Sequence, residues 1–159
     1  AKIVYGLVST GVIDLRAPEH VSSTVALPFE DALPLVQQAN AALDAGDAEQ
    51  ALVHARAGIA ADPQSAEARL AAGRALARLG RHADSAEELR KAAQSDPLNP
   101  HVQLELGFAA ARRGEFGLAV AAWEHYLRAI PSAPQAGRVR AAVDAVRHLT
   151  RALEDHAGV

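Results

Sequence analysis

Residues 97–131 read PLNPHVQLELGFAAARRGEFGLAVAAWEHYLRAIP, with a proline at each end and Gly114 near the middle. The chain repeats this layout outward at a step of 34 residues: prolines stand at 63, 97 and 131, and glycines at 46, 80 and 114. A third series of small residues keeps the same step, at Ala39, Gly73 and Gly107. A period of 34 with helical patterns in between is typical of stacked helix pairs. The sequence therefore predicts an all-α superhelix, or solenoid, of three helix hairpins.

The individual helices are predicted from apolar periodicity and from these stop signals. Their ranges are 31–44, 48–61, 66–79, 83–95, 100–113 and 116–130. Each glycine closes the first helix of a pair in the left-handed conformation, and each proline ends the second helix because it cannot continue it. A longer helix over about 134–156 is predicted to be a capping helix, apolar on one face and charged on the others. Trp123 is predicted to lie in the core, against this cap near Val143 and Val146.

The chain is expected to divide into two parts. Residues 30–157 form the predicted repeat domain, with repeats at about 32–65, 66–99 and 100–133. Residues 1–29 are expected to hold a short helix and a linker, which is either the tail of a preceding regulatory domain or a helix that covers the first repeat. Since no methionine is present, we expect the chain to be a piece of a longer or processed protein.

The composition argues against several classes of protein. The 16 Lys and Arg residues are outnumbered by 19 Asp and Glu residues, so no net positive charge attracts nucleic acid or an anionic membrane. The absence of cysteine excludes disulfides and thiolate chemistry. No apolar run approaches the roughly 20 residues that span a bilayer, and no signal-peptide pattern is visible. We expect a cytoplasmic protein, and the excess of 14 arginines over two lysines indicates a bacterial source.

No catalytic constellation is visible in the sequence. The seven histidines lack the i, i+4 pairing of a metal-binding helix, and no serine lies in a Gly-x-Ser-x-Gly turn. Adjacent carboxylates such as Glu87 and Glu88 are interpreted as solvated helix charges. The prediction is a protein that is not an enzyme and that uses no cofactor or metal.

The repeats resemble the tetratricopeptide repeat. The third unit carries the family's residues most fully, at Leu106, Gly107, Gly114, Phe116, Ala119, Trp123 and Pro131. The second unit carries Gly73, Gly80, Leu89, Ala92 and Pro97, with Ser85 where the family usually has alanine. The first unit is degenerate, with Ala39 in place of the glycine. The resemblance covers roughly residues 30–131 and implies a right-handed superhelix whose usual work is to hold other proteins.

The resemblance also implies where a partner binds, because in this family the first helix of each hairpin lines a concave face. Carried over position by position, the predicted partner-binding groove consists of Asn40, Leu70, Arg74, Arg78, His101, Leu104, Phe108 and Arg112. The same positions place Leu33, Val36, Leu43, Asp44, Glu67, Ala77 and Ala111 on this face. The apolar members are expected either to anchor a partner or to pack against neighbouring helices. The arginines are expected to bind carboxylates, which their planar guanidinium groups match.

The expected function is a protein-interaction module, or scaffold, that binds a partner peptide with acidic and apolar residues, as one domain of a larger bacterial protein. Two alternatives are kept: a self-association module that forms a homo-oligomer, and an accessory targeting arm of a catalytic domain elsewhere in the parent chain. One subfamily clamps the carboxylate end of chaperone tails, but only Asn40 of its clamp residues is present here, so that function is not supported. Nucleic acid and membranes are not expected as partners.

Overall fold

The structure, a computed structural model, describes residues 32–157. In this range it contains seven α-helices and no strand: α1 (Ala32–Asp44), α2 (Ala48–Ala61), α3 (Ala66–Arg78), α4 (His82–Ser95), α5 (Pro100–Arg112), α6 (Phe116–Ala129) and α7 (Ala136–Ala157). Each predicted helix is present, and its ends lie within about two residues of the prediction. The all-α prediction is confirmed, whereas the expectation for residues 1–29 lies outside the described residues.

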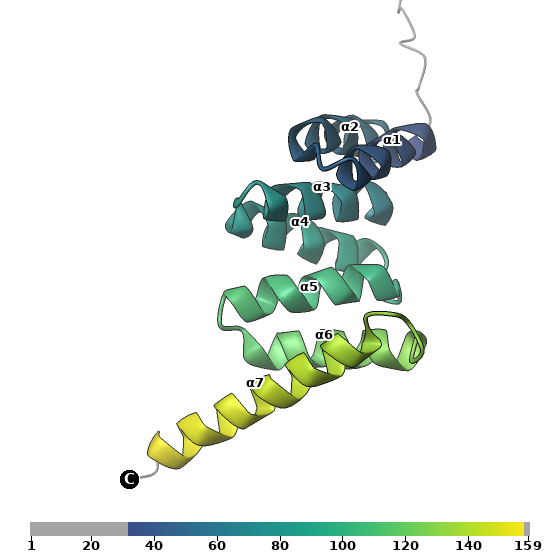
Figure 1. Ribbon diagram of the computed structural model, residues 1–159. Helices are drawn as coiled ribbons and strands as arrows, with labels where there is room; N and C mark the ends of the chain where they lie inside the picture. The colour runs from purple at the N-terminus through teal and green to yellow at the C-terminus, as the bar shows by residue number, and fades with distance from the viewer. Residues whose placement is uncertain (1–31, 158–159) are drawn as a thin grey trace, which may run out of the picture.

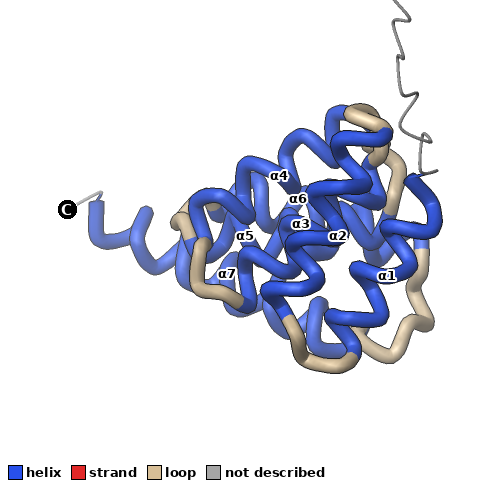
Figure 2. The backbone as a smooth tube through the Cα atoms, turned by 90° about the horizontal axis from the view of Figure 1, so that it is seen from above, coloured by secondary structure: helices blue, strands red, loops and turns tan. Residues whose placement is uncertain are grey.

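The helices form a stack of hairpins. α1 pairs with α2, α3 with α4 and α5 with α6, and the pairs follow one another along the molecule in chain order (Figure 1). The first helices of successive pairs also pack together, α1 on α3 and α3 on α5, and α7 packs on α6. Seen from above, the end of α7 projects well beyond the other helices (Figure 2). The predicted solenoid is therefore confirmed, and it is built from contacts between neighbouring elements.

The three turns inside the hairpins share one geometry. Gly46, Gly80 and Gly114 have φ angles of 85°, 74° and 74°, in the left-handed region that glycine adopts without strain. The N–H group of the residue after each glycine donates to the carbonyl five residues before itself, as Arg81 donates to Leu76 over 2.9 Å. These bonds satisfy carbonyls at the end of the first helix. The chain therefore reverses direction within three residues.

Small residues let the two helices of a pair approach closely. Gly73 on α3 lies against Leu89 on α4, and Gly107 on α5 lies against the indole of Trp123 on α6. Ser85, where the family usually has alanine, is buried, and its hydroxyl donates to the Gly73 carbonyl over 2.7 Å. This departure from the family pattern leaves no unsatisfied hydroxyl in the core.

Trp123 lies where the capping helix meets the third hairpin. Its side chain is only 2% exposed and packs in one core cluster with Tyr126, Val139 and Val143, while Val146 contacts the edge of this cluster. The prediction that Trp123 is a core residue near Val143 and Val146 is confirmed.

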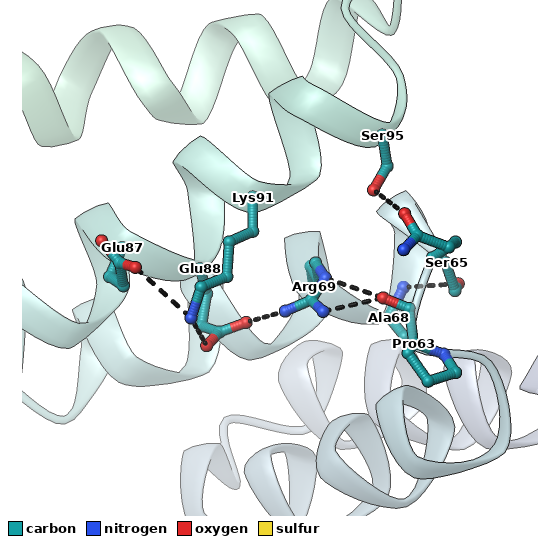
Figure 3. A network of polar contacts seen from close by, with 9 residues as sticks. Pro63, Ser65, Ala68, Arg69, Glu87, Glu88, Lys91 and Ser95 are labelled. Atoms are coloured by element: carbon teal, nitrogen blue, oxygen red, sulfur yellow. Dashed lines mark hydrogen bonds and ion pairs between the residues drawn. The ribbon is translucent and has the colours of Figure 1, made fainter.

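A polar network connects the first hairpin to the second (Figure 3). Arg69 on α3 donates from Nη2 to the carbonyl of Pro63 over 2.7 Å, and its Nη1 lies 2.9 Å from Oε2 of Glu88 on α4. Nζ of Lys91 lies 3.4 Å from Glu87 and 3.5 Å from Glu88. Arg69 thus joins the loop that carries the repeat proline to the second helix of the next pair.

Candidate functional site

The first helices of the three hairpins line a groove made of two adjoining hollows. The larger has a volume of about 510 Å³ and is lined by Asn40, Asp44, Glu67, Leu70, Arg74, Asn99, His101, Leu104, Glu105 and Gln135. The smaller has a volume of about 210 Å³ and is lined by Arg74, Ala77, Arg78, Glu105, Phe108 and Arg112. Arg74 and Glu105 line both hollows, which therefore adjoin each other. We call them together the concave groove.

All eight predicted groove residues line one of these hollows. Those on the larger one are Asn40, Leu70, Arg74, His101 and Leu104; Arg78, Phe108 and Arg112 line the smaller one, together with Arg74. They come together because α1, α3 and α5 pack in sequence, which places equivalent repeat positions side by side. The structure therefore brings these side chains to one surface, and their use by a partner is a proposal.

The apolar members of the groove are unequal. Leu104 is 5% exposed and packs in the same core cluster as Trp123, so it offers a partner little surface. Leu70 and Phe108 are half-buried. The Phe108 ring also meets the Trp123 ring edge to face, with centroids 5.2 Å apart. Apolar surface on the groove therefore comes from Leu70 and the outer side of Phe108.

The cations of the groove differ in how far they are already bonded within the chain. Nε of Arg74 lies 3.4 Å from Oε1 of Glu105, which joins α3 to α5. The guanidinium of Arg78 donates to the carbonyl of Leu43 on α1. Arg112 is exposed and has no ion-pair partner within 4 Å among the described residues. Of the three arginines, Arg112 is therefore the most available to an external carboxylate.

Glu105 is the least expected member of the groove, because it brings a carboxylate into the row of cations. Its side chain is 30% exposed, and burial raises the pKa of this carboxyl above its ordinary value. The positive charges of Arg74 and Arg112 oppose that shift, and those of Arg78 and His101 do so to a smaller extent. The neighbouring positive charges thus stabilise the ionised carboxylate, but by less than the loss of hydration destabilises it.

We expect Glu105→Gln to flatten the dependence of stability on pH in the weakly acidic range. Because the folded-state pKa is raised, the folded protein binds this proton more readily than the unfolded chain. The stabilisation that comes from this preferential protonation is fully present below the pKa of a glutamic acid in the unfolded chain. It is lost as the pH rises through the pKa of Glu105 in the folded protein. Urea unfolding at a series of pH values, for wild type and variant, measures the difference.

Two further variants make this measurement specific. Glu67→Gln makes the same substitution at an exposed carboxylate of the same groove and is the matched control. A His101→Gln background removes the nearby imidazole, whose positive charge also acts on Glu105. Equal flattening by Glu67→Gln and Glu105→Gln would contradict a special environment for Glu105.

The sequence contains a pattern that places Glu105 on the groove, although the family's groove positions, carried over one by one, do not include this residue. His101, Glu105, Phe108 and Arg112 follow one another at steps of four, three and four residues. Residues at this spacing lie along one stripe of a helix. Asn99 and Gln135 were missed for a different reason, since both belong to connecting loops. Loop residues have no fixed place in a helical pattern.

Outside the concave groove, the described chain has further hollows but no cluster of metal-binding side chains. Residues 32–157 contain no group of three or more His, Asp or Glu side chains placed to hold a metal ion. Over the same range, each helix is too short or too polar to cross a membrane. A further hollow of about 290 Å³ lies between α2, α3 and α4 and contains the charged residues Arg56, Arg81, Asp84, Glu87 and Glu88.

Comparison with known proteins gives similar folds at low sequence identity. The first tetratricopeptide domain of human RPAP3 is 18% identical, with a TM-score of 0.68 over 80% of this chain and 98% of that one. The Yersinia enterocolitica type III secretion chaperone SycD, in complex with a peptide of the translocator YopD, is 17% identical, with a TM-score of 0.64 over 74% and 93%. The first such domain of Spaghetti (RPAP3), bound to the HSP90 peptide SRMEEVD, is 20% identical, with a TM-score of 0.64 over 78% and 94%.

The sequence comparisons agree with this fold. None of the curated proteins matches the sequence. The family model for the tetratricopeptide repeat matches residues 36–100, which span most of the first two hairpins. The third hairpin carries the same repeat residues and the same glycine turn. Residues 36–100 therefore match the tetratricopeptide repeat family, and the third hairpin continues the same repeat pattern and turn geometry.

Proposed function

We propose that this chain is a protein-interaction module that holds a segment of a partner protein in the concave groove. The observation that carries the proposal is the groove itself, which crosses all three hairpins and presents charged, polar and apolar side chains together. Two proteins of similar fold were solved with peptides, one from YopD and one from HSP90.

The chemistry of the groove favours a partner segment that is both acidic and apolar. Arg112 and Arg78 attract carboxylates at one end, where the planar guanidinium group can form paired hydrogen bonds. Leu70 and Phe108 offer the adjoining apolar surface. Asp44 lies at the end of α1 and repels further acidic residues there. The segment is therefore expected to place its carboxylates near Arg112 and its apolar side chains along α3 and α5.

Glu105 is expected to oppose an acidic partner. Its carboxylate already occupies one side of Arg74, and it lies within the hollow that Arg112 lines. A partner carboxylate that enters this hollow meets like charge unless Glu105 is protonated or turns away. Removing the charge of Glu105 should therefore strengthen the binding of acidic segments, while reversing the charge of Arg112 should weaken it.

These opposite effects can be measured without knowing the natural partner. A random peptide library is selected on the wild-type protein, and the enriched peptides are expected to combine Asp or Glu with large apolar residues. Affinities of those peptides are then measured for wild type, Arg112→Glu and Glu105→Gln. We expect Arg112→Glu to weaken binding roughly tenfold, which corresponds to about 1.4 kcal/mol, and Glu105→Gln to strengthen it. Added salt should weaken wild-type binding, because exposed charge pairs are screened.

The choice of variants follows from the contacts in the groove. Arg56→Glu makes the same charge change on α2, outside the groove, and is the matched control for Arg112→Glu. Arg74→Glu is less suitable because it would place a second carboxylate beside Glu105. Phe108→Ala is less suitable because the ring packs on Trp123. Peptides that bind equally to Arg112→Glu and Arg56→Glu would move the proposed site away from the groove.

The finer parts of the function are also proposals. The usual work of the tetratricopeptide repeat, which is to hold other proteins, supports a scaffold without catalysis. A cytoplasmic location, as part of a larger bacterial protein, fits the composition. The second candidate function is an accessory arm for a catalytic domain elsewhere in the parent chain. The scaffold and the accessory arm would both bind a partner in the concave groove, so the peptide selection tests these two functions together.

A further inference from the structure

One ion pair joins the second hairpin to the third. Nη2 of Arg90 on α4 lies 2.7 Å from Oε1 and 2.6 Å from Oε2 of Glu115, the residue that precedes α6. Nε of Arg113 also lies 2.7 Å from Oε1 of Glu115. Hydrogen bonds from Arg113 and Arg90 lower the pKa of the Glu115 carboxyl. This interval between hairpins therefore holds a carboxylate between two guanidinium groups.

The interval between the first and second hairpins carries two arginines at the same repeat positions. Arg56 on α2 stands 34 residues before Arg90, and Arg81, which precedes α4, stands 34 residues before Glu115. Both arginines line the hollow of about 290 Å³ between α2, α3 and α4, which we call the α2–α4 hollow. Nε of Arg81 lies 2.8 Å from Oδ2 of Asp84, whereas Arg56 forms no ion pair within residues 32–157. No side chain of that range takes the place of Glu115 here.

The carboxylates of α4 that line this hollow are balanced by other cations. Oε2 of Glu88 lies 2.9 Å from Nη1 of Arg69, and Nζ of Lys91 lies 3.4 Å from Glu87 and 3.5 Å from Glu88 (Figure 3). These carboxylates are therefore not directed to Arg56. In the part of the chain that the structure describes, Arg56 is the lining charge that no opposite charge balances.

The floor of the α2–α4 hollow is apolar. Leu52 on α2 and Leu76 on α3 are 6% and 3% exposed, and Ile59 on α2 is half-buried. The next interval has alanine at the three equivalent positions, 86, 93 and 110. The hollow lies between α2 and α4, which both pack on α3 but share no contact with each other. It therefore combines an unbalanced guanidinium group with large apolar side chains.

We propose that the α2–α4 hollow is a second docking site, which takes an acidic residue of a partner protein together with an adjacent large apolar residue. The partner's carboxylate lies between Arg56 and Arg81, as Glu115 lies between Arg90 and Arg113 in the next interval. Paired hydrogen bonds from a planar guanidinium group favour a carboxylate there. The apolar neighbour packs on the floor of the hollow. The site is separate from the concave groove, because no residue lines both.

Arg81→Glu tests the placement of the carboxylate without any partner. The substitution supplies from the chain itself the ion pair that Arg90 and Glu115 form in the next interval. We expect it to raise the urea midpoint of unfolding when Arg56 is present, and to raise it less or not at all in an Arg56→Gln background. Loss of the Arg81–Asp84 pair affects both backgrounds and cancels in this double-mutant cycle. An equal change of midpoint in both backgrounds would overturn the placement.

The docking itself is tested with a random peptide library. Peptides are selected on wild type and then depleted on Arg81→Glu, whose hollow carries its own carboxylate. We expect the remaining peptides to combine Asp or Glu with a neighbouring large apolar residue, and to bind Arg56→Gln and Arg81→Glu about tenfold more weakly than wild type or worse. Arg128→Gln is the matched control and should leave the affinity unchanged, since Arg128 is exposed on α6 and lines neither the hollow nor the groove. Circular dichroism checks that each variant is folded.

The responses of the peptides separate this site from the concave groove. Peptides held in the groove are weakened by Arg112→Glu and not by a change at Arg56, whereas peptides held in the α2–α4 hollow respond in the opposite way. If no peptide distinguishes wild type from Arg81→Glu, or if the remaining peptides lack acidic residues, the docking site is overturned and the groove proposal still stands. A wild-type dimer that Arg81→Glu dissociates in sedimentation equilibrium would overturn a separate partner, because the carboxylate would then come from a second copy of the chain.

Discussion

Replacing Trp123 with alanine is expected to lower the free energy of unfolding by about 3–5 kcal/mol, the usual cost of truncating a buried tryptophan. The indole is 2% exposed and fills the space between Gly107, Phe108 and the capping helix. Its loss leaves a cavity that the rigid helices around it cannot close. In a solenoid, stability is carried by contacts between neighbours. We therefore expect α5, α6 and α7 to lose hydrogen-exchange protection before α1 and α2.

The measurement needs a probe other than fluorescence, because Trp123 is the only tryptophan of the chain. Urea unfolding followed by circular dichroism serves for wild type and variant alike. Leu118→Ala is the matched control on the same helix, since this leucine is 38% exposed and its truncation should cost less than about 1 kcal/mol. Similar losses for Trp123→Ala and Leu118→Ala would mean that Trp123 is not the centre of the C-terminal core.

Adding a single methyl group at Gly107 is expected to destabilise the protein, although alanine is the better helix former. A Cβ at this position would lie 2.4 Å from both Cδ1 and Nε1 of Trp123. The indole is a rigid ring that is 2% exposed, so it cannot give way as the end of a flexible side chain could. Overpacking of this kind typically costs about 1–3 kcal/mol, which exceeds the gain of about 1 kcal/mol in helix propensity. We expect Gly107→Ala to lower both the melting temperature and the urea midpoint.

Gly117→Ala provides a control with the opposite sign. This glycine lies in the first turn of α6, and a Cβ there would meet no atom within 4 Å. The variant is expected to stabilise the protein by up to about 1 kcal/mol. Combining Gly107→Ala with Trp123→Leu should cost less than the sum of the two single changes, because the smaller side chain makes room for the methyl group. Additive losses of stability would show that the Trp123 ring is not the reason why position 107 requires glycine.

The helices could be predicted because their ends are set by local chemistry. A left-handed glycine closes a helix, and a proline cannot continue one beyond its first turn, so Gly80 and Pro97 mark the limits of α3 and α4 in the sequence itself. The core position of Trp123 could be predicted for a related reason. The repeat assigns it to the face of α6 that meets the next element, and a large aromatic side chain fits only there.

The character of the groove was predicted less well. Repeat positions identified the helix faces, but the exposure of each side chain depends on the distance between neighbouring helices. Leu104 has the same repeat position as Leu70, yet it is buried beneath the larger core of the third hairpin. Glu105 forms an ion pair with Arg74, which lies 31 residues earlier in the sequence, because α3 packs beside α5. Such pairings arise only when the hairpins are stacked.

The stacking of the hairpins has a consequence for how the groove keeps its shape. α1 contacts α2 and α3, and α5 contacts α3, α4 and α6, but α1 and α5 share no contact of their own. The separation between Asn40 and His101, on opposite sides of the larger hollow, therefore depends on two successive joints at α3. Small rotations at each joint add together, so the width of the groove is an adjustable property of the molecule. A bound segment that touches both walls would fix that width, and segments of different bulk would select different curvatures of the same array.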